Sequence, residues 1–229
     1  MHFSLITPTP GQERDAAHDW ARNAYEEHQW LWRFLPAPPG TARSFVFRRR
    51  DADGLPRFYV VSHSAPTSPT PQWQVQSRPY APSLAAGDHL AFELRANPVV
   101  TVKTAQGKAA RHDVVMQART LLLKERHLTH WADWTAPERP SMPALVQQSC
   151  CAWLLARCER LGIRLDVSAL NADGYEQHQG KRGQLRFSTV DFSGHLTVVD
   201  PTALHSALVG GVGHAKAFGC GLLLIRPIG

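Results

Sequence analysis

The sequence predicts an α+β protein built from two similar halves. Segments in which apolar and polar residues alternate, as in half-buried strands, are interspersed with segments whose apolar residues recur at helical spacing. The same order of segments begins again after residues 79–88, a stretch that holds two prolines and a glycine. The 229 residues suffice for two small domains, each with its own core. We therefore expect an N-terminal domain over residues 1–82 and a C-terminal domain over residues 88–229.

The first half is expected to contain four strands and one helix. Apolar residues at helical spacing predict a single helix from Gln12 to Leu35, which Pro36 ends. Asp53-Gly54 is a turn signal between two alternating segments and predicts a hairpin. A second helix is weak or absent in this half. The strands are expected at residues 2–8, 43–49, 57–64 and 73–78.

The second half begins with a long strand over residues 89–103, bent at Asn97-Pro98, and a polar, basic loop that follows it to His112. Asp200-Pro201 has the residue types of a helix cap and first turn, so a short helix is expected to run from there to Gly210-Gly211. The other helices are expected at residues 113–128 and 143–161. The remaining strands are expected near residues 163–170, 184–192, 195–199 and 222–226, with a turn at Ser193-Gly194.

Each half therefore follows the order β-α-β-β-(α)-β. This is the order of the ferredoxin-like split βαβ fold, which is also the layout of RNA-recognition modules. The predicted fold class is α+β with tandem ferredoxin-like domains. It depends on element order, since the two halves show no sequence similarity to each other.

The composition favours an anionic partner. Lys and Arg total 25 against 19 Asp and Glu, which gives a net charge of +6 and suits nucleic acid or an acidic surface. No apolar run approaches the roughly 20 residues of a membrane span, and the first residues lack the basic start of a signal peptide. The four cysteines form no CxxC pair, and three of them are interpreted as small buried residues of the helix at 143–161. We expect a cytoplasmic protein with no membrane partner.

Tyr25 and His28 are the candidates for proton transfer. They lie three residues apart and so share one face of the first predicted helix. A histidine gains and loses a proton near neutral pH, and Tyr25 can position a leaving oxygen or share the proton transfer. The alternative is a structural role, because His28 also lies beside the apolar stripe of this helix. Glu26 and Glu27 are interpreted as solvated charges of the helix surface.

The other histidines predict no metal site. His127 and His130 lack a matching set of carboxylates, and no HExxH motif is present. GxSxG motifs are also absent. We therefore expect no metal and no other cofactor.

Five glycines and Lys216 fall between residues 210 and 221, immediately before the last apolar strand. This segment is not a phosphate-binding P-loop, because it lacks GK[ST] and precedes a strand instead of a helix. A helix cap and a tight strand entry explain one or two of the glycines. The others would let the backbone approach a ligand closely, and Lys216 suits an anionic one.

Further basic residues are candidates for phosphate contacts, although a solvated surface is the alternative for each. Lys181-Arg182-Gly183 leads into a strand that carries Arg186, which predicts a basic hairpin able to follow a duplex backbone. The complete set of predicted RNA-binding residues is Lys103, Lys108, Arg111, Lys181, Arg182, Arg186, Gly213, His214 and Lys216. Arg33, Arg43 and Arg48–Arg50 are further basic candidates.

The segment Gly211–Pro227 closely resembles the C-terminal signature of the CasE family, the CRISPR RNA-processing endoribonucleases of type I-E systems. The resemblance extends along the whole chain, because further family motifs occur in family order. These are Tyr25-x-x-His28-x-x-Leu31-Trp32, Arg43–Arg48, Phe92–Pro98 and Phe192–Pro201.

The resemblance implies tandem ferredoxin-like domains and metal-independent cleavage of repeat RNA at the base of its stem-loop. In that reaction the 2′-hydroxyl attacks the adjacent phosphorus and leaves a 2′,3′-cyclic phosphate and a 5′-hydroxyl. His28 and Tyr25 would supply the base and the acid, in an order that stays open. Arg33 stands where the family can carry a basic residue. Arg33 follows His28 by five residues, which on an ideal helix is a rotation of about 140° around the axis. It therefore joins the site only if the helix ends early or the side chain curls back.

The resemblance also implies that the glycine loop with Lys216 contacts the RNA stem, with Lys181 and Arg182 on the hairpin side of the same duplex. Shape and phosphate contacts should dominate, because an A-form stem hides its bases in a deep groove. The product would stay bound in Cascade with the other subunits, and we expect the free protein to be a monomer. Two alternatives stay open: a non-catalytic RNA-binding subunit of the same fold, and a small-molecule enzyme of ferredoxin-like fold.

Overall fold

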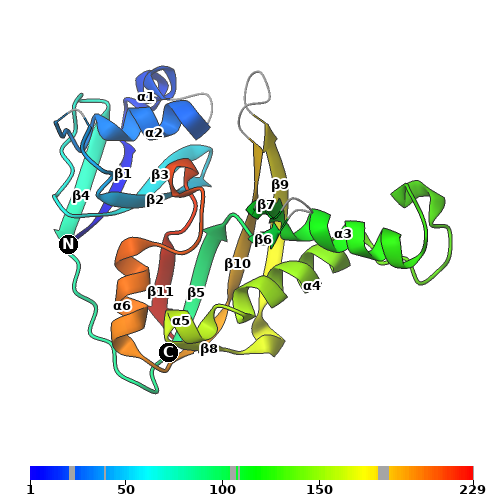
Figure 1. The fold of residues 1–229 in the computed structure, drawn as a ribbon. Helices are drawn as coiled ribbons and strands as arrows, with labels where there is room; N and C mark the ends of the chain where they lie inside the picture. Colours follow the sequence, from blue (N-terminus) through cyan, green and yellow to red (C-terminus); the bar gives the residue numbers. More distant parts are fainter. Residues whose placement is uncertain (21–23, 39, 104–106, 108, 180–185, 229) are drawn as a thin grey trace.

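The computed structural model describes residues 1–20, 24–38, 40–103, 107, 109–179 and 186–228 (Figure 1). Two antiparallel sheets, one from each half of the chain, lie next to each other, and a two-stranded ribbon lies beside the second.

The first sheet has the strand order β2-β3-β1-β4, with every neighbouring pair antiparallel. Its core is rich in aromatic residues, among them Trp30, Phe47 and Phe58. No helix lies between β3 and β4, as the sequence predicts. The elements of this half are β1 (His2–Pro8), α1 (Glu13–Asp19), α2 (Ala24–Trp32), β2 (Phe45–Ala52), β3 (Leu55–Ser62) and β4 (Trp73–Pro79).

The expectation of one helix over residues 12–35 is wrong, because the structure forms α1 and α2 instead. Helix α1 ends at Asp19, since Trp20 has extended backbone with ψ 148°. The Asp19 carboxylate accepts hydrogen bonds from the indole N–H groups of Trp30, at 3.1 Å, and Trp73, at 3.0 Å. One carboxylate thus joins α1, α2 and β4. This long-range contact has no counterpart in the apolar periodicity that predicts a helix.

The second sheet has the strand order β11-β5-β10-β8, and β9 also pairs with β10. Helix α6 begins as the sequence predicts, because the Asp200 carboxylate accepts the backbone N–H groups of Thr202 and Ala203. The strands of this half are β5 (His89–Ala96), β6 (Val99–Lys103), β7 (Ala109–Asp113), β8 (Ile163–Leu165), β9 (Asn171–Gln179), β10 (Arg186–Val198) and β11 (Leu223–Pro227). The helices are α3 (Val114–Glu125), α4 (Met142–Leu155), α5 (Cys158–Leu161) and α6 (Pro201–Gly210), with short 3₁₀ turns η1 (Trp131–Asp133), η2 (Val167–Ala169) and η4 (Lys216–Phe218).

The two sheets share one topology. In each, the first main strand lies between the third and the last, and the second lies at the edge beside the third. The predicted α+β fold with tandem ferredoxin-like domains is therefore confirmed. The boundary between residues 82 and 88 stays a proposal, which is supported by the end of β4 at Pro79 and the start of β5 at His89.

Several element predictions for the second half are wrong. Ser193-Gly194 does not form a turn: β10 runs through it, with Gly194 opposite Phe92 of β5. A Cβ atom at position 194 would lie 2.9 Å from the carbonyl oxygen of Ala169, so the glycine allows a close backbone approach inside a strand. Strand β9, not expected from the sequence, is the hairpin partner of β10. The expected basic loop after residue 103 contains strand β7, which pairs with β6.

The helix expected over residues 143–161 is divided into α4 and α5. The backbone N–H of Arg157 donates to Leu154 instead of Trp153, which tightens the last turn of α4. The Trp153 carbonyl accepts the Arg157 guanidinium instead, at 2.6 Å. The strand predicted at residues 163–170 is shorter in the structure, where β8 covers only Ile163–Leu165 and the 3₁₀ turn η2 follows it.

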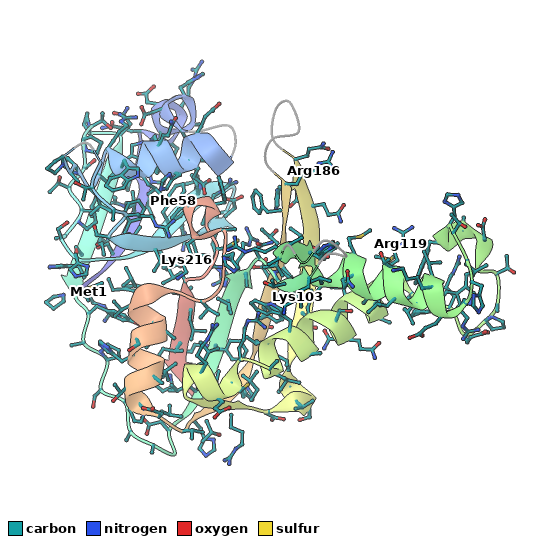
Figure 2. All side chains as sticks on the ribbon, viewed as in Figure 1. Met1, Phe58, Lys103, Arg119, Arg186 and Lys216 are labelled. Atoms are coloured by element: carbon teal, nitrogen blue, oxygen red, sulfur yellow. The ribbon has the colours of Figure 1, made fainter. Side chains whose placement is uncertain are left out.

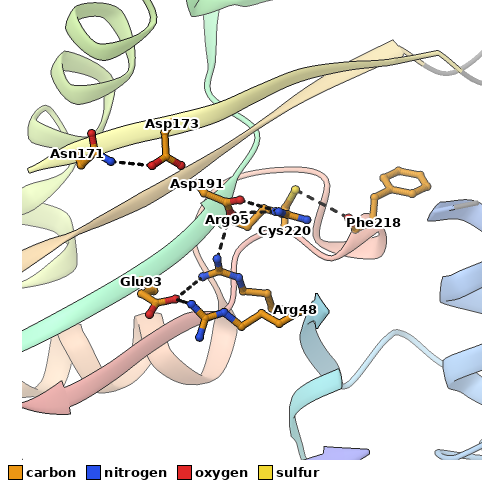
Figure 3. A network of polar contacts seen from close by, with 9 residues as sticks. Arg48, Glu93, Arg95, Asn171, Asp173, Asp191, Phe218 and Cys220 are labelled. Carbon is orange, nitrogen blue, oxygen red and sulfur yellow. Dashed lines mark hydrogen bonds and ion pairs between the residues drawn. The ribbon is translucent and has the colours of Figure 1, made fainter. Parts of the chain in front are cut away.

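A network of ion pairs joins the two sheets (Figure 3). Arg48 of β2 is 5% exposed and lies between Asp191 of β10, at 3.1 Å, and Glu93 of β5, at 3.5 Å. Arg95 donates two hydrogen bonds to the Asp191 carboxylate, at 2.9 and 2.6 Å, and Arg50 pairs with Glu93. The network fixes β2 of the first domain against the centre of the second sheet.

Candidate functional site

The loop between α6 and β11 reaches across to the first domain, where η4 contacts α2 and β2 (Figure 1). Two of its glycines allow close approaches, one to the first domain and one within the loop. A Cβ atom at Gly211 would lie 2.9 Å from the Val46 side chain, and one at Gly221 would lie 2.8 Å from the carbonyl oxygen of Val212. The backbone N–H of Val212 donates to Gly221 at 2.8 Å and closes the base of the loop. The loop is thereby held against the helix that carries Tyr25 and His28.

His28 lies half-buried on α2 between Trp32 and Phe45, with ring centroids 6.2 and 6.0 Å away. Its Nε2 atom is buried and has no hydrogen-bond partner among the described residues. Burial lowers the pKa of His28, and the positive charge of Arg43 lowers this pKa further. Both effects favour the neutral imidazole, the form that accepts a proton.

Tyr25 lies on the same helix three residues before His28, but its side chain is outside the described part of the structure. Helix α2 ends at Trp32, so the early helix end that Arg33 requires does occur. The Arg33 guanidinium, however, forms an ion pair with Asp19 at 2.9 Å. The only cation whose charge shifts the pKa of His28 in the described structure is Arg43.

Lys216 lies at the start of η4, in the loop that faces the first domain (Figure 2). Its ammonium group donates to the carbonyl oxygen of Gly210 at 2.6 Å. Burial lowers the pKa of Lys216, and the positive charges of Arg43 and Arg160 lower it further. Ala215, which precedes it, has a φ of 55°, a strained value for a residue with a side chain. Because the charge of Arg43 lowers the pKa of both His28 and Lys216, Arg43 lies within electrostatic reach of both.

A cleft of about 790 Å³ lies between β7, the β9–β10 hairpin and the glycine loop. It brings together three of the predicted RNA-binding residues, Arg111, Arg186 and His214. Phe187 lies at its wall, stacked between His178 and Phe218 with centroid distances of 4.7 and 4.9 Å. This stack connects the hairpin to η4.

The other predicted RNA-binding residues are distributed differently. Lys103 is exposed at the end of β6 and does not line this cleft (Figure 2). Gly213 and Lys216 line a separate hollow on the α6 side of the loop. Lys108, Lys181 and Arg182 lie outside the described residues.

Glu27 differs from its sequence-based interpretation as a solvated charge, which is wrong. It is 7% exposed, and burial raises the pKa of its carboxyl to about 7, against the opposing effect of Arg49, whose guanidinium lies 3.5 Å away. Helical spacing alone does not reveal this burial, because η4 approaches α2 from a segment nearly two hundred residues later.

The structure gives three arginines an importance that the sequence does not show. Arg43 is one of several general basic candidates in the sequence, and Arg157 and Arg160 are not among them. Arg157 and Arg160 line the same hollow as Lys216. Their only sequence signal is a spacing of three residues at the end of a helical segment.

The described residues offer neither a metal site nor a membrane span. They contain no group of three or more His, Cys, Asp or Glu side chains arranged to hold a metal ion. None of their helices is long and apolar enough to cross a membrane. All four cysteines are free thiols, with Cys150 and Cys220 buried and Cys151 and Cys158 partly so.

The sequence and the fold were compared with those of known proteins. The family model described as "CRISPR associated protein" matches residues 1–227. Cascade subunit CasE of Escherichia coli K12 is 29% identical, over 93% of this chain and 96% of the relative. The CRISPR-associated endoribonuclease Cse3 of Thermus thermophilus is 30% identical, over 93% of this chain and 94% of the relative. A solved structure of CRISPR endoribonuclease Cse3 bound to a 19-nucleotide RNA has a TM-score of 0.67 and 26% identity, and covers 99% of this chain and 98% of that one. The chain therefore belongs to the CasE family of CRISPR-associated proteins.

Proposed function

We propose that this protein is a CRISPR endoribonuclease that cleaves precursor repeat RNA at the base of a stem-loop and keeps the mature RNA bound. The observation that carries the proposal is the similarity to CasE and Cse3 over nearly the whole chain, with a His28 that favours its neutral form beside a cationic loop. Relatives named as an endoribonuclease and a Cascade subunit support both the reaction and the partners.

In the proposed reaction the 2′-hydroxyl of the nucleotide before the cut loses its proton to a base. Its oxygen bonds to the adjacent phosphorus, the P–O5′ bond breaks, and an acid protonates the departing oxygen. His28 and Tyr25 supply these two groups. The lowered pKa of His28 suits a base at neutral pH, and the assignment of base and acid stays open.

The phosphorane that forms carries extra negative charge, which nearby cations stabilise. Arg43, whose charge lowers the pKa of His28, and Lys216, at the start of the η4 turn that contacts α2, are the cations proposed for this role. Arg33 stays a proposed member of the site and would have to leave Asp19 to reach it.

The stem is proposed to lie along the cleft between the β9–β10 hairpin, β7 and the glycine loop. Arg111, Arg186 and His214 line this cleft and can contact phosphates of a duplex. The same role is proposed for Lys103, Lys108, Lys181, Arg182, Gly213 and Lys216. The partners are the repeat RNA and the other Cascade subunits. A cytoplasmic location is proposed because this is where such RNA and four unpaired cysteines would be found.

Incubation of the protein with its cognate repeat RNA in EDTA tests the proposal. Metal-independent cleavage with a 2′,3′-cyclic phosphate product is the expected result. Intact RNA under conditions of tight binding would instead favour a non-catalytic RNA-binding subunit of the same fold. Absence of salt-dependent RNA affinity would favour a small-molecule enzyme.

A further inference from the structure

The cleft between β7, the β9–β10 hairpin and the glycine loop, where the stem is proposed to bind, is called the stem cleft below. A separate basic hollow lies on the other side of the glycine loop. It has a volume of about 380 Å³ and is formed by the end of α4, α5, α6 and the loop. Its cationic residues are Arg157, Arg160 and Lys216, with His214 at the rim shared with the stem cleft.

No carboxylate in the described part of the chain compensates the charge of this hollow. No Asp or Glu is among its described lining residues. By contrast, another cleft, between β2 of the first domain and β5, β9 and β10 of the second, combines its arginines with Glu27, Glu93 and Asp191. The Arg157 guanidinium donates only to the backbone carbonyls of Trp153 and Val99, and Lys216 donates to that of Gly210. Within the described residues, none of the three cations forms an ion pair.

These like charges act on one another. Arg160 lowers the pKa of Lys216, and Arg111, Lys216, Arg157 and Arg160 all lower that of His214, after the larger effect of burial in each case. Holding cations together without an anion costs free energy, which a bound phosphate would recover.

Lys216 lines the hollow and begins η4, which contacts α2, the helix that carries His28. Arg160 lies within electrostatic reach of Lys216, Lys216 of Arg43, and Arg43 of His28. Cations therefore extend from the contact between η4 and α2 to Arg160 of α5, and neither Lys216 nor Arg160 lines the cleft proposed for the stem. In the proposed reaction the cut lies at the base of the stem, so the RNA strand at His28 would continue into the stem on one side of the cut and into the single-stranded flank on the other.

We propose that the hollow around Arg157, Arg160 and Lys216 binds a backbone phosphate of the single-stranded RNA on the 3′ side of the cut. This inference depends on the proposed function and adds to it a contact with the part of the precursor that leaves. Backbone recognition by arginine and lysine is independent of sequence, so the flank is recognised as a polyanion whatever its bases.

The test compares two RNAs, each with a 2′-deoxy nucleotide before the cut so that neither is cleaved. One ends a single nucleotide after the cut, and the other carries a flank of eight further nucleotides. Arg160→Ala is expected to weaken binding of the flanked RNA by about tenfold, the loss of one charged hydrogen bond, and to lower its salt slope by about one. Binding of the short RNA should not change.

The matched control is Arg164→Ala, which removes the same charge from an exposed position on β8, outside the hollow. Equal weakening of both RNAs by Arg160→Ala would place the contact on the stem and overturn the inference. Unchanged binding of both would show that the hollow contacts no RNA and would also overturn it. A separate assay tests the proposed function: wild-type protein is incubated with an unmodified, cleavable stem-loop RNA. If this RNA stays intact, the proposed function is wrong, whatever the binding results for Arg160→Ala.

Discussion

Arg48 and Asp191, 143 residues apart in the sequence, form a hydrogen-bonded ion pair of 3.1 Å across the two domains. Arg48 is almost fully buried, and its position between Asp191 and Glu93 compensates its charge (Figure 3). The same Asp191 accepts two hydrogen bonds from Arg95. This carboxylate therefore holds the two sheets in the arrangement that brings η4 onto α2.

Asp191→Asn should lower the free energy of unfolding by about 3 kcal/mol, because it removes the nearer of the two carboxylates that compensate the buried Arg48 guanidinium. For a chain of this size the melting temperature should fall by roughly 6–12 °C. Thermal and urea unfolding measure the change. Asp51→Asn is the control, since it removes a carboxylate from an exposed pair with Arg49 and should cost under about 1 kcal/mol. A loss of similar size in both variants would contradict the role of Asp191.

Glu27→Gln should flatten the pH dependence of stability. Burial raises the pKa of Glu27 from 4.5 to about 7 in the folded state, so the folded protein binds a proton more tightly than the unfolded chain between these values. Stability should therefore fall as pH rises from about 4.5 to 7, by up to about 3 kcal/mol from this group.

Urea unfolding at pH 5 and pH 8 measures this effect. The difference between the two pH values should be smaller in Glu27→Gln than in wild type, while Glu125→Gln, at an exposed position of α3, should leave it unchanged. An equal difference in wild type and Glu27→Gln would show that Glu27 titrates normally.

His28→Ala should reduce single-turnover cleavage by about 10²–10⁴-fold, the usual contribution of a positioned acid or base, and retain stem-loop binding. Because His28 packs against Phe45, His28→Gln serves as a second variant that fills the same space. Cleavage gels and filter binding give the two readouts. Equal loss of cleavage and binding in both variants would identify His28 as a structural residue.

The pH–rate profile of cleavage should have one limb that reports the pKa of His28. Arg43→Met should shift this limb toward higher pH. Burial is the larger cause of the lowered pKa of His28 and remains in the variant, but the charge of Arg43, the second cause, is removed. The pKa of His28 therefore rises. Single-turnover rates between pH 5 and 8.5 measure the limb. Arg14→Met, an exposed change on α1, controls for the loss of one positive charge, and an unmoved limb in Arg43→Met would separate Arg43 from His28.

Lys216→Ala should weaken RNA binding and lower its salt slope by up to about one, as expected for one lost phosphate contact. Titrations at several salt concentrations measure the slope. Lys124→Ala removes an equal charge from α3, away from the glycine loop, and should leave the slope as it is. An unchanged slope in Lys216→Ala would limit this lysine to its bond with Gly210.

Most of the regular structure, and the family, can be predicted from the amino-acid sequence. Local signals were sufficient for the helix start at Asp200-Pro201 and for the hairpin between β2 and β3, because caps and turns depend on a few neighbouring residues. The family motifs also placed Tyr25 and His28 on one helix. Glycine signals were ambiguous, since Gly194 marks a close approach inside a strand and not a turn.

The groups that surround that helix depend on how the two domains pack and cannot be predicted from the sequence. The burial of Glu27, the proximity of Arg43 to His28 and Lys216, and the pairing of Arg48 with Asp191 all join segments far apart in the chain. Apolar periodicity records which face of an element is buried, but it carries no information on which distant side chain packs there. The charge and the proton affinity of the site depend on those distant neighbours, and the packing of the two domains brings them together.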